Sequence, residues 1–172
     1  WSSVGQDTLG DGAFETGGIL AISIHNGQIY VGGGFTDAAD EAFADYLAYW
    51  TGEEWLPVYA VGVDGPINCA VYSLLWVGSD LYIGGCFTNV RAQPSCDYIT
   101  VFNGGDFACL GDTGGNGVLN GMVRTLTNFN GNIDCSILSE VPAAGSASGN
   151  GTYQFDVFRG VEPSGDYNWG CF

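Results

Sequence analysis

The stretch Ile29-Tyr-Val-Gly-Gly-Gly-Phe-Thr36 returns 52 residues later as Leu81-Tyr-Ile-Gly-Gly-Cys-Phe-Thr88. A second piece recurs at the same spacing, since Asp45–Trp50 matches Asp97–Phe102. Self-similarity at a fixed period of this length is typical of repeat architectures, in which each unit is one supersecondary element. The sequence therefore predicts a chain made of repeated units.

A third and more diverged copy of the unit follows. Residues 123–133 repeat its opening and residues 153–160 its later part, but the Gly-Gly-x-Phe signature is lost. Trp169–Phe172 matches Phe107–Leu110 at the end of the second unit, and Trp1–Gly5 matches it again. The chain thus reads as one isolated final piece followed by three whole units.

Each unit contains four short segments rich in β-branched and aromatic residues, which favour strands. In the second unit these segments are Val71–Trp76, Leu81–Phe87, Tyr98–Phe102 and Phe107–Leu110. Turn signals such as Asn26-Gly27 separate them and predict hairpins. We interpret Ala38–Trp50 as a loop followed by a strand, because its counterpart in the second unit contains Pro94.

Four antiparallel strands per unit of this length are typical of a β-propeller blade. We expect a single all-β domain over residues 1–172, with blades at 19–58, 71–110 and 123–172. Residues 1–18 would form the outer strand of a preceding blade plus a linker. A closed propeller needs at least four blades. Three arrangements stay open: a piece of a longer propeller, a propeller completed by several chains, or an open array of stacked blades.

Glycines and aromatic residues recur at equivalent places in the units. A mid-strand glycine usually marks a bulge or a close backbone approach, and we expect such an approach between neighbouring blades. The recurring aromatic residues favour packing between blades, with sugar stacking, as in lectins, as the alternative. The recurring residues are Trp1, Gly32, Gly33, Phe35, Trp55, Gly84, Gly85, Phe87, Phe107 and Trp169.

The repeated pattern, with its Gly-Gly-x-Phe strand, its Asp-Tyr strand ending in Phe-Asn-Gly, and its final Trp or Phe, resembles the kelch-like repeats of the galactose-oxidase central-domain superfamily. It looks most like extracellular variants of that repeat. The resemblance implies a propeller fold and no particular activity. Copper oxidases of the superfamily need several histidine and tyrosine ligands. Because His25 is the one histidine, we do not expect that chemistry here.

Six cysteines are present without any Cys-x-x-Cys pair, which favours disulfides over zinc. Disulfides in turn indicate an extracellular or cell-surface protein. We expect Cys86 and Cys96 to pair, because they end the second strand and begin the third. The pairing of the others stays open; they are Cys69, Cys109, Cys135 and Cys171. Asn150 begins a glycosylation sequon, Asn-Gly-Thr, which agrees with secretion.

The charge excludes several partners. The chain has 19 acidic residues, three arginines and no lysine, for a net charge of −16. Nucleic acids and anionic membrane surfaces would be repelled rather than bound. The sequence also lacks an apolar run of the roughly 18 residues that a membrane-spanning helix requires. We therefore expect neither nucleic-acid binding nor membrane insertion.

The acidic stretch after the first Gly-Gly-x-Phe strand is the main candidate for a binding site. Asp37, Asp40 and Glu41 are candidate calcium ligands, since calcium prefers carboxylate oxygens; a solvated loop is the plainer interpretation. Asp45 and Asp97 recur before a tyrosine and are expected to cap turns. His25 is expected to be an exposed turn residue, and one histidine supports no catalytic triad. We expect no catalytic residues and no cofactor.

These observations favour an extracellular structural or adhesive propeller protein that acts through assembly. Its partners would be copies of itself or further blades of a longer protein. The alternative is a lectin-like module that binds a glycan, and an enzyme is the third hypothesis.

Overall fold

The computed structural model describes residues 4–5, 12–14, 16–59, 65–110, 119, 121–129, 132–141, 152–161 and 168–171. These residues form three four-stranded antiparallel sheets, one from each repeated unit. In each sheet the strands lie side by side in chain order, so every connection is a simple hairpin or loop. The all-β prediction is confirmed.

The first sheet contains β1 (Ile19–His25), β2 (Gln28–Gly33), β3 (Leu47–Trp50) and β4 (Trp55–Pro57). A tight Asn26-Gly27 turn with positive φ at both residues joins β1 to β2. Between β2 and β3 the chain makes one short 3-10 turn, Ala38–Asp40, and no longer helix. Loop followed by strand is therefore the conformation of residues 38–50.

The second sheet repeats the first. It contains β5 (Val71–Val77), β6 (Asp80–Gly85), β7 (Ile99–Phe102) and β8 (Phe107–Cys109), and its loop carries a 3-10 turn at Val90–Ala92. The third sheet contains β9 (Met122–Phe129), β10 (Asn132–Val141), β11 (Thr152–Val161) and β12 (Asn168–Cys171).

The first strand of every sheet carries a β-bulge at the same repeat position. The register shifts between Ile19 and Ala21 in β1, and between Val71 and Ser73 in β5. In the third sheet Ser136 pairs with Thr125 and Ile137 pairs with Val123, so the bulge falls between them. A bulge bends the strand and strengthens its twist, so all three sheets are shaped alike.

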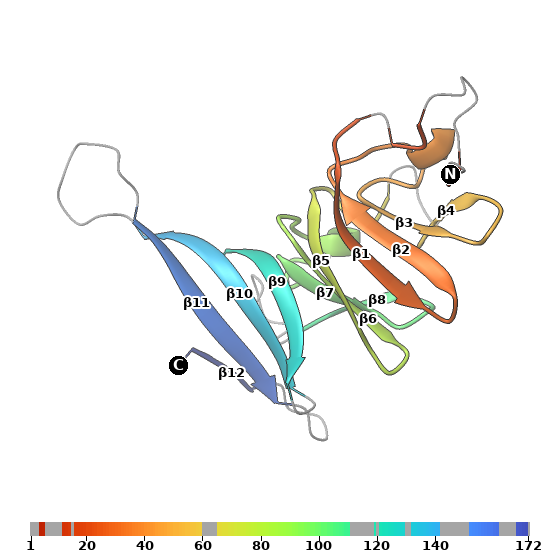
Figure 1. Cartoon of the computed structure of the whole chain (residues 1–172). Helices are drawn as coiled ribbons and strands as arrows, with labels where there is room; N and C mark the ends of the chain where they lie inside the picture. Colours follow the sequence, from red (N-terminus) through yellow and green to blue (C-terminus); the bar gives the residue numbers. More distant parts are fainter. Residues whose placement is uncertain are drawn as a thin grey trace.

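The three sheets stand in a row along the chain (Figure 1). The first strands hold the row together, because β1 and β2 contact β5, and β5 and β6 contact β9. Apolar cores lie between neighbouring sheets as well as within them. The described residues form an open row and no closed ring.

Val4 and Gly5 lie against the first sheet. The backbone carbonyl of Val4 accepts a hydrogen bond of 3.0 Å from the indole N–H of Trp55. Neither residue is part of a strand. The interpretation of residues 1–18 as the end of a preceding blade stays a prediction.

Candidate functional site

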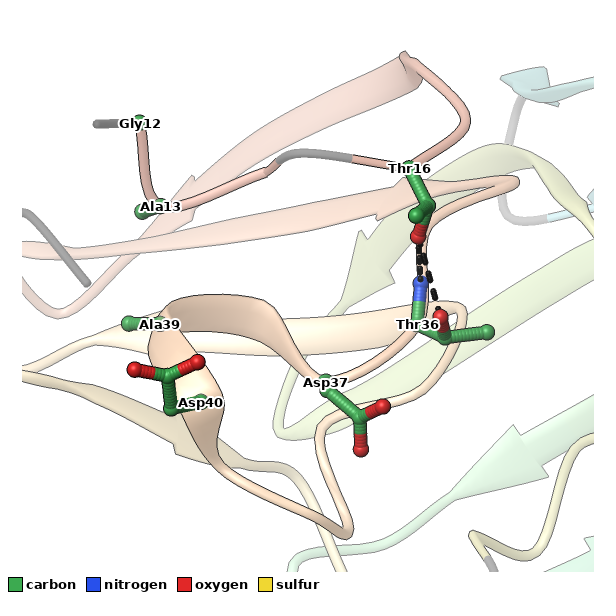
Figure 2. Close-up of a pocket in the computed structure, with 7 residues that line it drawn as sticks. All are labelled: Gly12, Ala13, Thr16, Thr36, Asp37, Ala39 and Asp40. Atoms are coloured by element: carbon green, nitrogen blue, oxygen red, sulfur yellow. Dashed lines mark hydrogen bonds between the residues drawn. The ribbon is translucent and has the colours of Figure 1, made fainter. Parts of the chain in front are cut away.

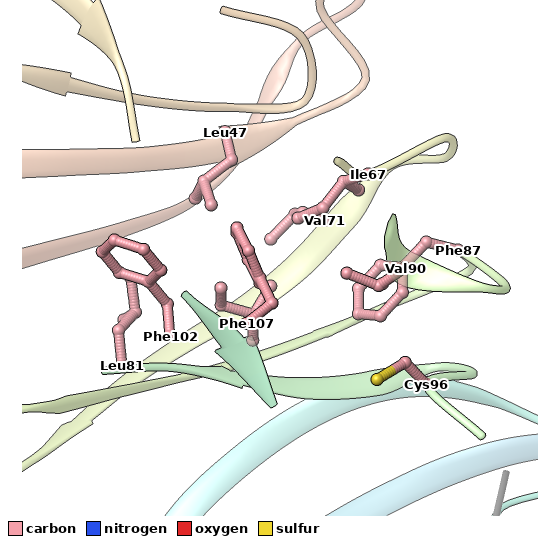
Figure 3. Packing of buried hydrophobic residues seen from close by; sticks show 10 residues of the cluster. Leu47, Ile67, Val71, Leu81, Phe87, Val90, Cys96, Phe102 and Phe107 are labelled. Atoms are coloured by element: carbon pink, nitrogen blue, oxygen red, sulfur yellow. The ribbon is translucent and has the colours of Figure 1, made fainter. Parts of the chain in front are cut away.

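A buried apolar cluster fills the contact between the first and second sheets. Figure 3 shows this cluster, to which Leu47 of β3 contributes from the first sheet and Val71 of β5 from the second. The buried members are Leu47, Ile67, Val71, Leu81, Ile83, Phe87, Val90, Cys96, Phe102 and Phe107. Leu47 thus enters an apolar cluster whose other buried members lie in residues 67–107, which makes the contact part of a core rather than a loose surface contact.

Glycine in the second strand makes this contact possible. A Cβ built on Gly32 would lie 2.9 Å from the Cβ of Val71 and closer still to Cγ1. In the next pair of sheets a Cβ on Gly84 would lie 3.0 Å from the Cβ of Val123. Val71 and Val123 are both completely buried. The first and second sheets therefore each receive a β-branched side chain of the next sheet on a bare glycine, which we call the glycine seat.

The second glycine of each pair meets backbone instead. A Cβ on Gly33 would collide with the carbonyl oxygen of Gly18, and one on Gly85 with that of Ala70. The amides of the following residues, Gly34 and Cys86, donate to these same carbonyls. The first glycine of each pair thus allows close packing between sheets, and the second allows close packing against the chain's own neighbouring backbone.

An aromatic cluster closes one end of the first contact. The imidazole of His25 stacks on the indole of Trp76 with ring centroids 3.8 Å apart, and Tyr30 meets the same indole edge-on at 5.0 Å. The prediction that His25 is an exposed turn residue is wrong, because it ends β1 and is half-buried by Trp76. The indole nitrogen of Trp76 is buried without a hydrogen-bond acceptor. Burial raises the pKa of Tyr30, and Tyr49 nearby raises it further.

The contact between the second and third sheets repeats this plan with a different core. Its buried members are Tyr82, Ile99, Val101, Leu110, Leu119, Val123, Ile133 and Cys135. The backbone N–H of Leu126 donates to the hydroxyl of Ser73 at 2.9 Å, and Arg124 lies 4.1 Å above the ring of Tyr72. Nothing in the sequence pattern pointed to Tyr72, Ser73 or Arg124 as contact residues, although their repeat positions could have done so.

The other side of the first sheet is only partly covered. Phe14 packs against Phe35 and Trp55 at 4.7 and 4.8 Å, in a cluster with Ala13 and Val31. In contrast, three β1 side chains on this side stay exposed; they are Ile19, Ile22 and Ile24.

A small cavity of about 210 Å³ lies on the same side of the first sheet. Trp50 and Trp55 line it, with ring centroids 5.4 Å apart, together with three carboxylate residues. The carboxylates are Glu41, Glu53 and Glu54. Aromatic faces beside carboxylates can hold a sugar ring by stacking and hydrogen bonding.

The predicted calcium residues are divided between two cavities. Figure 2 shows Asp37 and Asp40 in a cavity of about 150 Å³, beside the hydrogen-bonded hydroxyls of Thr16 and Thr36. Glu41 instead lines the cavity of Trp50. Within the described part of the chain, no group of three or more acidic, histidine or cysteine side chains is placed to hold a metal ion.

Asp45 and Asp97 brace the loops in which these residues lie. The carboxylate of Asp45 accepts a 2.8 Å hydrogen bond from the backbone N–H of Asp37, and Asp97 does the same for Asn89 at 2.7 Å. Each bond spans eight residues, so these carboxylates close a loop rather than a local turn. The following tyrosines, Tyr46 and Tyr98, have φ of 61° and 64°. A left-handed conformation is costly outside glycine, and the braced loop holds it in place.

The predicted Cys86–Cys96 pairing is wrong. Among the described residues, disulfides join Cys69 to Cys86 and Cys96 to Cys109, with Cα atoms 5.4 and 4.6 Å apart. The amide of Cys86 donates to the carbonyl of Ala70, so Cys86 lies beside the segment that precedes β5. Cys109 lies on β8, opposite Thr100 of β7. Cys96 lies just before the start of β7. Cys86 and Cys96, at the ends of the two inner strands, are therefore each bridged toward the outer strand next to their own.

Cys135 is buried in the second contact, with 1% of its surface exposed, and belongs to neither disulfide. Trp169 and Cys171 lie on β12, where the structure describes the backbone; Trp169 pairs with Gly160. Trp1 and Asn150 lie outside the described residues.

Comparisons with family models, with curated proteins and with solved structures find no match to this chain. In the described segments, the structure contains no helix of the length and apolarity that crossing a membrane requires.

Proposed function

We propose that this chain is an extracellular structural or adhesive protein, built of β-propeller blades, that acts by assembly into a larger complex. One observation carries the proposal. The sheets join through repeat-equivalent faces, and the first sheet leaves the corresponding face of β1 exposed. An exposed apolar face next to two occupied equivalents indicates a surface that is covered in the working protein.

The propeller interpretation draws on the order and the period of the units. Four antiparallel strands in chain order, stacked side by side with a period of 52 residues, have the organisation of propeller blades. The kelch-like resemblance of the sequence pattern supports the same interpretation. Because a ring closes with four or more blades, the proposal requires further blades from outside the described residues.

The two disulfides and their place support an extracellular location. Both bridges lie at or next to the strands of the second sheet and link neighbouring segments. Bridges of this kind persist in oxidising surroundings and are reduced in the cytosol. The proposed role is non-catalytic, since His25 is engaged by Trp76 and the carboxylate of Asp45 accepts a hydrogen bond from the loop backbone.

A lectin-like module is the second candidate, and the cavity lined by Trp50 and Trp55 favours it. The equivalent positions of the second unit argue against the lectin. Phe102 and Phe107 occupy the equivalent positions in the second sheet and are 8% and 4% exposed within a contact between sheets. Aromatic residues at these positions therefore pack against another sheet wherever one is present. Binding on a broad glycan array, lost on Trp50→Ala, would support the lectin; silence across all sugar classes would remove it.

The mass of the native particle tests assembly. Analytical ultracentrifugation and crosslinking of material from the natural source should place this chain in a particle far larger than its own 18.0 kDa. A native particle that stays a monomer of that mass at every concentration would overturn the proposal.

A further inference from the structure

The exposed side of β1 has the composition of a contact core. Ile19, Ile22 and Ile24 are 39%, 65% and 69% exposed. We call these three side chains the open face. Three large aliphatic side chains on one edge strand form an apolar patch of the kind that marks an interaction surface.

The repeat shows what such a face normally contacts. Ile19 stands where β5 has Val71 and β9 has Val123, and both valines are completely buried on a glycine seat. Ile22 likewise stands where β5 has Leu74, which packs into the core between the first and second sheets. The same face is therefore covered twice within this molecule, each time by the second strand of the preceding sheet.

The third sheet of this chain does not present a seat. Ser136 occupies the position of Gly32 and Gly84, and its hydroxyl is hydrogen-bonded to that of Thr125 at 2.6 Å. A Cβ at this position collides with the incoming β-branched residue, so Ser136 leaves the third sheet without a seat.

The two glycine seats of the chain are already filled. Val71 occupies Gly32 and Val123 occupies Gly84. A second folded copy of this chain therefore offers the open face no vacant seat, whichever sheet it presents.

We propose that the open face binds a further four-stranded sheet of the same repeat type, one whose second strand carries a vacant diglycine seat. This inference rests on the proposed function, and it names both the surface and the chemistry of the partner. Ile19 fills the seat, and Ile22 and Ile24 pack beside it. The row of sheets then has a direction: it extends from the β1 side and not from the β10 side.

The test supplies the missing sheet in the full chain. A second copy of residues 19–70 is inserted directly before Ile19, which places a vacant seat 39 residues ahead of Ile19, the same spacing that separates Gly32 from Val71. The inserted seat should slow hydrogen exchange of the original β1 amides about tenfold or more, as expected for a strand that becomes buried. The matched control carries Gly32→Ser in the inserted copy alone, the residue found at 136, and should leave β1 exchange unchanged. Equal protection by both insertions, or by neither, overturns the inference.

A second measurement does not depend on the folding of the inserted copy. Ile22→Thr with Ile24→Thr changes two exposed side chains, so the purified chain should keep its melting temperature within a few degrees. The same double variant, expressed in the natural source, should lose at least tenfold in incorporation into the native particle. Unchanged incorporation would overturn the open face as the binding surface while leaving assembly itself in place.

Self-association is the remaining outcome. If the unmodified chain dimerises with rising concentration and Ile24→Thr abolishes the dimer, a second copy covers the open face and the proposed partner is wrong. A native particle that is monomeric removes the proposed function itself, so the two failures are distinguishable.

Discussion

Val71 stands directly over Gly32, so that a Cβ on the glycine would lie 2.9 Å from the Cβ of the valine. The pair joins β2 of the first sheet to β5 of the second, and Val71 is completely buried there. The same relation holds between Gly84 and Val123. A glycine in a strand is usually a weakness, but here it determines how closely two sheets approach.

Gly32→Ala and Gly84→Ala should each destabilise the chain by about 1–3 kcal/mol, because an added methyl overpacks a contact with a stiff β-branched side chain. Gly18→Ala is the matched control, since a Cβ there meets nothing within 4 Å. Urea unfolding measures the change. The cycle of Gly32→Ala with Val71→Ala should show a favourable coupling energy, because truncation of the valine makes room for the methyl. Additive effects would mean that the two residues do not touch.

The disulfides give a direct chemical prediction. Proteolysis without reduction should release peptides that link Cys69 to Cys86 and Cys96 to Cys109. Removal of either bridge by paired substitution to serine should cost about 2–4 kcal/mol in the free energy of unfolding, because each closes a loop of moderate length. Recovery of a peptide that links Cys86 to Cys96 would contradict this pairing.

The loop carboxylates should matter more than their acidic neighbours. Asp45→Ala and Asp97→Ala remove the acceptor for a backbone N–H in each loop, and each should cost about 1–3 kcal/mol by thermal or urea unfolding. Asp37→Asn should be nearly neutral, since the second unit already has Asn89 at that position. A larger loss for Asp37→Asn than for Asp45→Ala would contradict the bracing role.

Tyr30 should make stability depend on alkaline pH. Burial and Tyr49 raise the pKa of Tyr30 in the folded chain, so the folded state favours the neutral phenol. Its contribution is fully present below the pKa of an unfolded tyrosine, about 10, and is lost as the pH rises through the higher folded value. Tyr30→Phe should therefore flatten the loss of stability above pH 10. An unchanged alkaline slope in the variant would exclude Tyr30 as the source.

The strands and their order could be predicted because the signals are local and repeated. Alternating apolar residues, Asn-Gly turns and the 52-residue period each occur within one unit, and each recurs in the next. The predicted strands of the second unit agree with β5 to β8 within a few residues. The mid-strand glycines could be recognised from the sequence as well, because they recur at the same repeat positions.

The candidate site was less predictable, because it lies between units. His25 appeared to be a turn residue from its neighbours in sequence, but Trp76, 51 residues away, stacks on it. The cysteine pairing failed similarly. An inner strand has two neighbours, and the spacing along the chain does not tell which one a side chain at the strand end faces. The hydrogen bond from the amide of Cys86 to the carbonyl of Ala70 places Cys86 beside the segment before β5. The pairing of Thr100 with Cys109 places Cys109 beside β7.

By itself the sequence determined an all-β chain of three similar units, since periodicity and turn chemistry depend on nearby residues alone. Only the tertiary structure decided which side of each sheet meets the next. It placed Val71 on Gly32 and Val123 on Gly84, and it left Ile22 and Ile24 exposed. Side chains alternate between the two faces of a strand and a bulge shifts that alternation. The face on which a residue packs is therefore fixed by the neighbouring sheet, which no single unit contains.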